Sequence, residues 1–322
     1  MADGTNGLRF ERLVVPTPYR VGPANVYVIT AEPITLIDCG PNTPETENAL
    51  LLGLASYGLA PEQIARIVVT HGHPDHYGLA AKLQARSGAT VLVGEADLPK
   101  VTSDRSMLMA TGRLLLGEGV PIETLLDMDR RGRRMEDIHP AVEDAVGLAG
   151  GETLRFDGFD LHVLHLPGHT AGHVCLLDRA TGVLFSGDTL LLDITPNPLL
   201  EPDPADPSER RQSLVEYIRS LDVLASLPLT RVHPGHGEPI EDPHGLIDGM
   251  REHHRARSED LAARLTTDGK TGWQLANEVF SGLEGFDNFL AVSEVVAHVD
   301  LLVREGRAEP VIRDGVTFYR KI

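Results

Sequence analysis

The stretch VVTHGHPDHYG, residues 68–78, places three histidines and an aspartate within six residues, directly after an apolar run. These four side chains are His71, His73, Asp75 and His76. Imidazole nitrogens and carboxylate oxygens are ligands that zinc and its neighbours accept. One histidine is often a buried, hydrogen-bonded residue, but four such groups at H-x-H-x-D-H spacing favour a metal site. We predict that site where the strand of residues 64–70 ends and a helix begins.

Three further motifs place ligand-type side chains after strand-like runs. They are LPGHTAGH (166–173), FSGDTL (185–190) and VHPGHGEP (232–239), which contribute His169, Asp188 and His236. In α/β folds, residues at the ends of strands on one edge of the sheet converge on a common site. One zinc ion usually takes three or four protein ligands, so seven candidates imply two metal ions.

Bulk composition narrows the class of partner. The chain has 322 residues, is 42% hydrophobic and has a formal net charge of −18. This charge disfavours DNA and RNA, whose phosphates are bound by clustered Lys and Arg, and favours a small-molecule substrate. With two cysteines, no signal-peptide core and no apolar run of roughly 20 residues, we expect a cytoplasmic protein without a membrane segment.

Alternating strand and helix patterns predict an α/β fold for the first domain, residues 1–242. Within it, residues 98–145 predict a helical insertion near the pocket, holding four of the six methionines. Met107 and Met109 are candidates for substrate contacts, with packing of the insertion as the alternative. The run RRGRR, residues 130–134, either grips an anionic group or is a solvated loop.

The tail, residues 243–322, reads as three helices and a hairpin, a winged-helix-like domain. It holds ten Lys and Arg against thirteen Asp and Glu. The third helix carries Glu294, Asp300 and Glu305 against Arg304, the opposite of a DNA-recognition helix. We therefore interpret the tail as a structural or dimerising appendage, which leaves a homodimer open.

Taken in order, THGHPDH, PGHTAGH, SGDTL and HPGHG resemble the motifs of the metallo-β-lactamase superfamily over about residues 10–240. The resemblance implies an αββα sandwich with the metals at the edge between two sheets. It also implies one metal on His71, His73 and His169, another on Asp75, His76 and His236, and Asp188 bridging them. The tail is similar to that of a lactamase-like branch that contains thioesterases and an endoribonuclease.

The chemistry implied is hydrolysis at a centre of two divalent ions, with zinc expected and iron or manganese as alternatives. Such ions lower the pKa of a shared water and give a bridging hydroxide at neutral pH. Asp75 is the catalytic candidate, because it would orient the nucleophile and carry a proton to the leaving group. We predict a small ester, thioester or lactone as the substrate.

Two other activities stay open. The same centre attacks phosphorus in phosphodiesterases and endoribonucleases, and iron-dependent sulfur dioxygenases share the fold. β-Lactam hydrolysis is disfavoured, because zinc lactamases generally have a cysteine where this chain has Asp188, and fold does not fix substrate. A non-catalytic binding module would show a degraded ligand set, whereas all seven positions are intact.

Several neighbours of the ligands are weaker candidates. His173, His233 and Cys39 are expected to orient ligands, with core packing as the alternative. Tyr77 and Thr195 are candidates for the lining of the substrate pocket, with core packing as the alternative for Tyr77.

Overall fold

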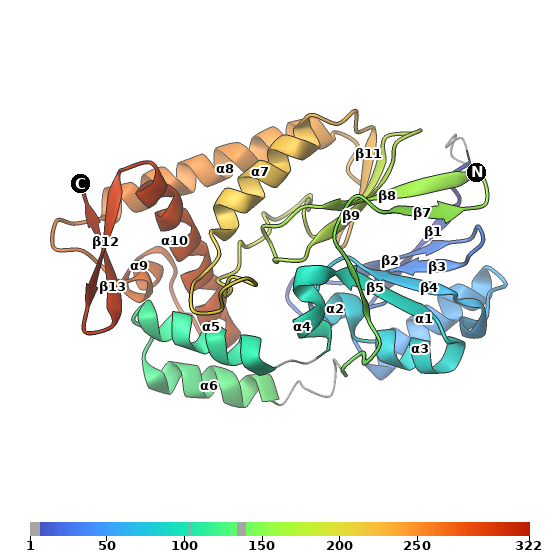
Figure 1. The fold of residues 1–322 in the computed structure, drawn as a ribbon, viewed down its shortest axis with the longest axis horizontal. Coiled ribbons are helices and arrows are strands. Elements are labelled where there is room, and N and C mark those ends of the chain that lie inside the picture. The colour runs from blue at the N-terminus through green and yellow to red at the C-terminus, as the bar shows by residue number, and fades with distance from the viewer. Residues whose placement is uncertain (1–6, 103–104, 134–139) are drawn as a thin grey trace.

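Two stacked β-sheets form the half of the molecule that contains the N-terminus (Figure 1). The computed structural model describes residues 7–102, 105–133 and 140–322. The first sheet has the order β1 (Phe10–Val15), β2 (Ala24–Ile29), β3 (Thr35–Ile37), β4 (Arg66–Val69), β5 (Thr90–Gly94), β6 (Val146–Leu148). The second has the order β11 (Arg231–Pro234), β10 (Val183–Gly187), β9 (Val174–Asp178), β8 (Phe159–His165), β7 (Thr153–Phe156).

Helices cover both outer faces of this pair of sheets. Helices α1 (Pro44–Ser56) and α3 (Ala80–Ser87) pack on the first sheet, and α7 (Ser213–Ala225) packs on the second. Along β2, Val26 and Val28 face the helices while Tyr27 and Ile29 face the other sheet, as the alternation of side chains in a strand requires. The predicted αββα sandwich is confirmed.

Strand direction brings four loops to one edge of the sandwich. Strands β8 and β10 are both antiparallel to β9, and β11 is parallel to β10, so these three strands end on the same side. In the first sheet, β4 ends at a loop followed by the single-turn helix α2 (Pro74–Tyr77). The four metal-ligand motifs lie in or directly after these strand ends.

The insertion and the tail form a second, helical body. The insertion holds α4 (Leu98–Val101), α5 (Arg105–Gly117) and α6 (Ile122–Arg133). The tail holds α8 (Pro243–Arg264), α9 (Gly272–Val279), α10 (Phe286–Arg304) and the hairpin of β12 (Ala308–Arg313) and β13 (Val316–Lys321). Leu115 and Val120 of the insertion lie in one core with Leu275, Val292 and Tyr319 of the tail. Helices α5 and α6 therefore pack with the tail, whereas Val101 of α4 and Val142 lie in the core of the sandwich; the sequence had grouped the whole insertion with the first domain.

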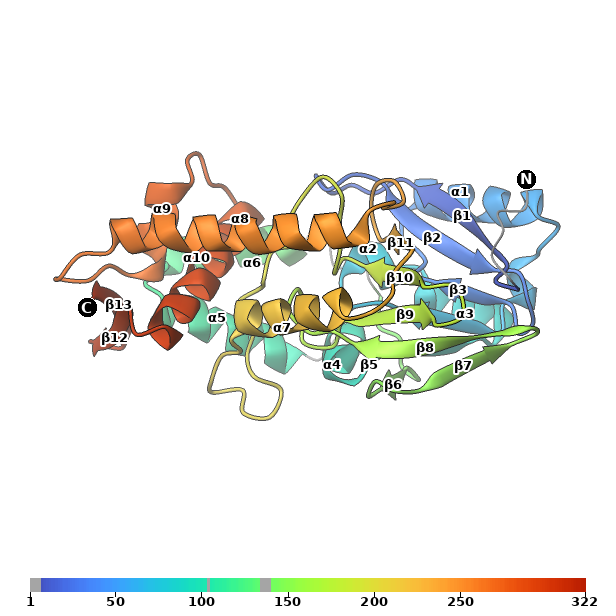
Figure 2. The same cartoon turned by 90° about the horizontal axis from the view of Figure 1, so that it is seen from above.

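The tail is joined closely to the sandwich. Helix α8 runs from the second sheet to the far end of the molecule (Figure 2), and its Ile247 and Met250 share a core with α7. Helix α10 is buried along most of its length, and its Glu294 and Asp300 are 8% and 7% exposed. These two acidic residues of the helix thus point inward. Three helices and a hairpin match the predicted order of elements, and the winged-helix description stays a prediction.

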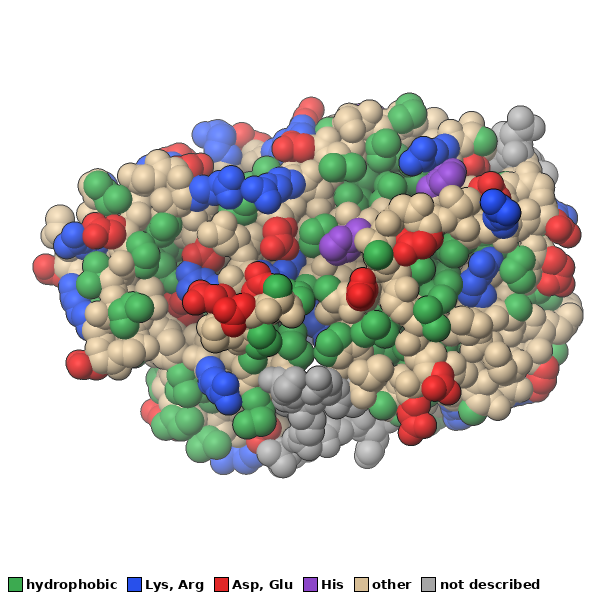
Figure 3. Space-filling model, viewed as in Figure 1, with side chains coloured by type: hydrophobic (Ala, Val, Ile, Leu, Met, Phe, Trp, Pro, Cys, Tyr) green, Lys and Arg blue, Asp and Glu red, His purple; other side chains and the backbone are tan. Residues whose placement is uncertain are grey.

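The surface shows charges of both signs. Acidic and basic side chains are interspersed over the face in Figure 3, and the coloured atoms there include no continuous basic area. Among the described residues, no helix combines the length and the apolar character needed to cross a bilayer.

A buried charged cluster ties the insertion to the tail. Glu118 is 2% exposed, and its carboxylate accepts hydrogen bonds from Arg210 (2.9 Å) and from the hydroxyl of Tyr319 (2.8 Å). Arg210 also pairs with Asp300 of α10. Burial raises the pKa of Glu118 to about 7, although Arg210 and Tyr319 act in the opposite direction.

This shift predicts a pH-dependent contribution to stability. Because the folded-state pKa exceeds the ordinary 4.5, the contribution of Glu118 is present below pH 4.5 and is lost as the pH rises through about 7. The Glu118→Gln variant has no ionisable group at this position. Its free energy of unfolding, relative to that of wild type, should therefore rise by ~2–3 kcal/mol between about pH 4.5 and pH 7. Urea unfolding of both proteins at each pH measures the difference, and a constant difference would contradict the assignment.

Candidate metal centre

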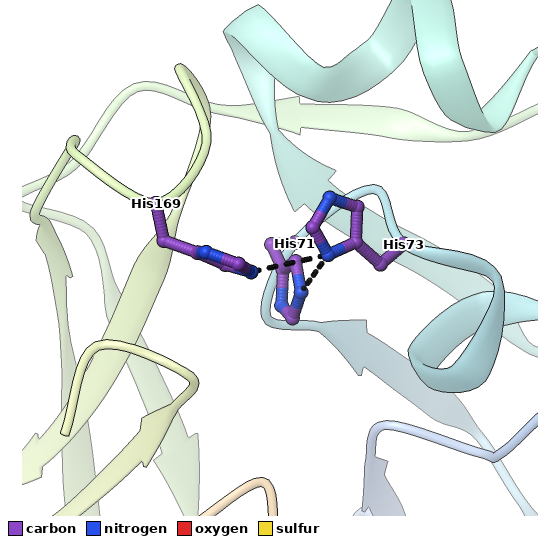
Figure 4. A group of neighbouring side chains, drawn as sticks. All are labelled: His71, His73 and His169. Atoms are coloured by element: carbon purple, nitrogen blue, oxygen red, sulfur yellow. Dashed lines mark hydrogen bonds between the residues drawn. The ribbon is translucent and has the colours of Figure 1, made fainter. Parts of the chain in front are cut away.

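Three histidines from two loops converge on one point. His71 follows β4, His73 caps α2, and His169 lies in the loop after β8. Nδ1 of His73 lies 2.9 Å from Nε2 of His71 and 3.1 Å from Nε2 of His169, and the ring nitrogens point toward one another (Figure 4). Three nitrogens bound tetrahedrally at ~2.0–2.1 Å from one zinc would lie roughly 3.3 Å apart. This group has the spacing of a metal site.

A second group lies beside the first. Asp75 and His76 occupy the single turn of α2, and His236 follows β11. Nε2 of His236 is 3.5 Å from Oδ2 of Asp75, and Nε2 of His76 is 3.9 Å from Oδ1 of the same carboxylate. The ligand atoms of this group, like those of the first, lie within 4.8 Å of one another.

Asp188, directly after β10, lies between the two groups. Its Oδ2 is 4.0 Å from Nε2 of His71 and 3.9 Å from Nε2 of His169. Toward the second group, Oδ1 is 3.5 Å from Nε2 of His76 and Oδ2 is 3.7 Å from Nε2 of His236. All seven predicted ligands are therefore assembled at one edge of the sandwich, with this carboxylate in the central position.

The donor set fits divalent cations. Nε2 of His76, Oδ1 of Asp188 and Nε2 of His236 are buried and have no hydrogen-bond partner within the described protein. Leaving a buried polar atom unpaired costs roughly 1–3 kcal/mol, so three of them together call for a ligand. Burial also lowers the pKa of His71, His73 and His169, which keeps these imidazoles neutral and able to bind a metal.

Hydrogen bonds on the far side of each ring set the direction of the free nitrogen. Nδ1–H of His76 donates to Asp38 (2.8 Å), and Nδ1–H of His236 donates to the carbonyl of Pro23 (2.8 Å). Nδ1–H of His169 donates to the carbonyl of Asn197 (2.8 Å). In each ring, Nε2 faces the centre, which is the arrangement of metal-binding histidines in general. Against the effect of burial, the carboxylate of Asp188 raises the pKa of His76 and of His236, so a cation would bind there in competition with a proton.

Asp38 is a site residue that the sequence did not reveal. It has a positive φ of 60°, and its carboxylate also accepts hydrogen bonds from the backbone N–H (2.7 Å) and the hydroxyl (2.9 Å) of Thr70. It thus joins the end of β3 to the loop after β4 and holds His76. Its signal was a carboxylate in IDCG at a strand end, adjacent to Cys39.

Two of the predicted orienting residues contact the ligands or their backbone. The ring of His173 stacks on His71 with centroids 4.9 Å apart, and its Nε2 accepts the backbone N–H of Asp188 (3.1 Å). Sγ of Cys39 donates to the carbonyl of His76 (3.3 Å) and is fully buried. His233 differs, because its ring packs against Phe10 and Phe185 in the sandwich core. These ring contacts are those of a core residue rather than of a group that orients a ligand.

The predicted substrate contacts are less well supported. Tyr77 is 2% exposed, belongs to the core below α2, and donates its hydroxyl to the carbonyl of Lys100, so its observed role is packing. Met109 is 64% exposed and Met107 is half-buried on α5. Thr195 is half-buried in the segment between Asp188 and α7. Among the described residues, no contact of Met107, Met109 or Thr195 with the metal centre is observed, and their role in substrate binding stays a prediction.

The basic run in the insertion is described only in part. Arg130 and Arg131 are exposed and pair with Asp127 on their own helix (3.4 and 2.8 Å). Residue 134, like Met135 of the insertion, lies outside the described residues.

Tyr19 is a further residue that sequence reasoning missed. It lies in the turn between β1 and β2, half-buried, and this turn ends at Pro23, the partner of His236. Burial raises the pKa of Tyr19, with the charge of Asp75 adding to the effect, so the phenol stays protonated. Only its place in the fold brings it there, because nothing in the local sequence distinguishes it.

Comparison with known proteins identifies the family to which this fold and site belong. The model of the metallo-beta-lactamase superfamily matches residues 19–236. The chain belongs to this superfamily. The matched region contains both ligand groups and Asp188, together with the insertion.

Two relatives of similar length match this chain over the tail as well as the sandwich. The probable metallo-hydrolase YqjP of Bacillus subtilis is 33% identical over 317 residues, covering 95% of this chain and 96% of that protein. The structure of the metallo-beta-lactamase family protein TTHA1429 from Thermus thermophilus is 31% identical with a TM-score of 0.83, covering 97% of this chain and 98% of that one. The hydroxyacylglutathione hydrolase GloC of Haemophilus influenzae is 32% identical over 124 residues, which is 38% of this chain and 49% of that enzyme. These relatives and the His/Asp cluster support a metal-dependent hydrolase.

The fit of the ligand set predicts that metal stabilises the fold. A ligand that binds only the folded state raises stability with its concentration. Removal of bound metal with EDTA should lower Tm by roughly 5–10 °C, and excess Zn²⁺ should restore it. Differential scanning calorimetry checks this, and equal Tm values with EDTA and with Zn²⁺ would show that the cluster binds no ion.

Proposed function

We propose that this chain hydrolyses a small ester, thioester or lactone at a centre of two zinc ions. His71, His73 and His169 would hold one ion, and Asp75, His76 and His236 the other, with Asp188 shared between them. The observation that carries the proposal is the pair of ligand groups on either side of one carboxylate, where three buried atoms have no hydrogen-bond partner among the described residues.

Bound divalent ions would lower the pKa of a coordinated water and polarise the oxygen of the bond to be cleaved. The protein's own groups would transfer the proton and hold the ligand side chains in position. Asp75 is 8% exposed at the edge of the centre, and its carboxylate would take the proton of the attacking water and deliver it to the leaving group. The bonds to Asp38, Pro23 and Asn197 hold the imidazoles in place, so little reorganisation is needed.

The choice of ester-type substrates rests on charge and on relatives. A chain with a net charge of −18 repels a polyanion, and the described part of the basic run pairs with Asp127 on its own helix. GloC, which the chain resembles in part, acts on a hydroxyacylglutathione by its name. Its match covers 38% of this chain, so we propose the ester and thioester class without naming glutathione.

The test combines elemental analysis with a panel of substrates. Wild type should contain about two zinc ions per chain and turn over an aryl ester, a lactone or a thioester faster than a phosphodiester or a short RNA. His71→Ala should lose turnover by ~10²–10³-fold or more, because a ligand of the centre is removed.

His244→Ala is the matched control, because His244 is an exposed histidine of α8 outside both ligand groups. Its turnover should equal that of wild type. Faster cleavage of RNA than of esters would replace the proposal with a nuclease, and about one iron ion per chain without hydrolysis would favour sulfur oxidation.

A further inference from the structure

A carboxylate outside the ligand set bonds both loops of the first histidine group. Asp97 ends the short helical turn η2 (Glu95–Asp97) after β5 and is fully buried. Its Oδ2 accepts the backbone N–H of Gly72 (2.8 Å) and the hydroxyl of Thr170 (2.6 Å). Its Oδ1 accepts the backbone N–H of Gly172 (3.0 Å). Gly72 separates the first two histidines of the group, and Thr170 directly follows the third, so one side chain joins the two loops.

The backbones around Asp97 are in direct contact. A Cβ atom added to Gly172 would lie 2.4 Å from the backbone nitrogen of Asp97, and one added to Gly94 would lie 1.7 Å from the carbonyl oxygen of Gly172. A Cβ on Gly72 would lie 2.9 Å from Cβ of Lys100. No larger residue fits without backbone movement, so the separation of the two loops is set by their packing on Asp97.

The charge of Asp97 is balanced within the same cluster. Nζ of Lys100 donates to Oδ1 of Asp97 (2.8 Å) and also to Glu201. Glu201 accepts the backbone N–H of Ala171 (3.1 Å) and pairs with Arg211. Two carboxylates and two cations, Asp97, Lys100, Glu201 and Arg211, therefore form a chain of ion pairs beside the loop that carries His169. The buried carboxylate of Asp97 is fully hydrogen-bonded.

The second ligand group has different supports. His76 is held by Asp38, and His236 by the carbonyl of Pro23. Among the described residues, the hydrogen bonds of Asp97 reach neither of these supports nor α2. The two groups can therefore be perturbed one at a time.

We propose that Asp97 is a positioning residue for the first metal ion. It fixes the two loops at the separation at which the three histidines converge, and its loss weakens that ion without weakening its neighbour. The inference rests on the proposed function only through the presence of metal, not through the reaction catalysed.

The test is a Co²⁺ titration of the full-length protein after removal of metal by a chelator, followed by visible absorption of the bound cobalt. Wild type should show two binding events. Asp97→Asn should weaken one of them by on the order of 10–100-fold and leave the other unchanged, as expected for loss of an outer hydrogen-bond partner.

Asp178→Asn is the matched control. Asp178 is also buried, and it also accepts a backbone N–H (Ala180, 2.9 Å) and a hydroxyl (Thr181, 2.7 Å). It ends β9, which runs antiparallel to β8 and β10, so it lies at the opposite edge of the sheet. Its cobalt spectra and both affinities should match those of wild type, with circular dichroism confirming the fold of each variant.

Thr170→Val is a second variant, to be used if Asp97→Asn does not fold. It removes a single hydrogen bond to Asp97, and valine is close to threonine in shape. It should weaken the same binding event by a few-fold.

Wild-type affinity for both ions in Asp97→Asn or in Thr170→Val, or equal losses in Asp97→Asn and Asp178→Asn, would overturn the inference. A wild type that binds no cobalt would overturn this inference and the proposed function together. Two bound ions without any hydrolysis would remove the proposed function alone.

Discussion

The constraint on which this structure depends is the gathering of seven candidate metal-ligand side chains, five buried and two half-buried, at one edge of a sandwich, where protein groups satisfy only part of their hydrogen-bonding capacity. Three of their atoms face one another without a partner, and two of the side chains are carboxylates. Such an arrangement is costly in a protein interior unless cations complete it. The surrounding architecture serves this constraint, because strand directions bring the loops together and hydrogen bonds on the far side of the His76, His169 and His236 rings aim their Nε2 atoms inward.

The helical body contributes to the same centre from a distance. The carbonyl of Asn197 holds His169, and the side-chain amide of Asn197 donates to the carbonyl of Leu290 in α10 (2.8 Å). Three residues further along, the N–H of Leu200 donates to the hydroxyl of Ser293 in the same helix (3.0 Å). The tail is therefore continuous with the support of a metal ligand. A buried α10 in this position also explains why its Glu294 and Asp300 pair with arginines instead of facing solvent.

Sequence reasoning predicted the fold and picked out the seven candidate ligand side chains that the structure brings together, because both depend on local signals. Apolar runs that end in His and Asp fix which residues follow strands, and the superfamily resemblance supplied the sandwich. Asp38 and Asp97 escaped it, because their roles come from contacts with loops 25 to 75 residues away in the chain. The core packing of His233 and Tyr77 could not be foreseen for the same reason, since adjacency in sequence to a ligand says nothing about which face of a strand or turn a side chain occupies. The packing of the insertion against the tail likewise required the three-dimensional structure.

Anomalous diffraction at the zinc edge, from crystals of the protein purified without chelator, tests the central claim most directly. The account predicts two peaks roughly 3.5–4 Å apart on either side of the Asp188 carboxylate. One peak should lie among His71, His73 and His169, and the other among Asp75, His76 and His236. A single peak away from Asp188, or no peak at this edge of the sandwich, would contradict the account.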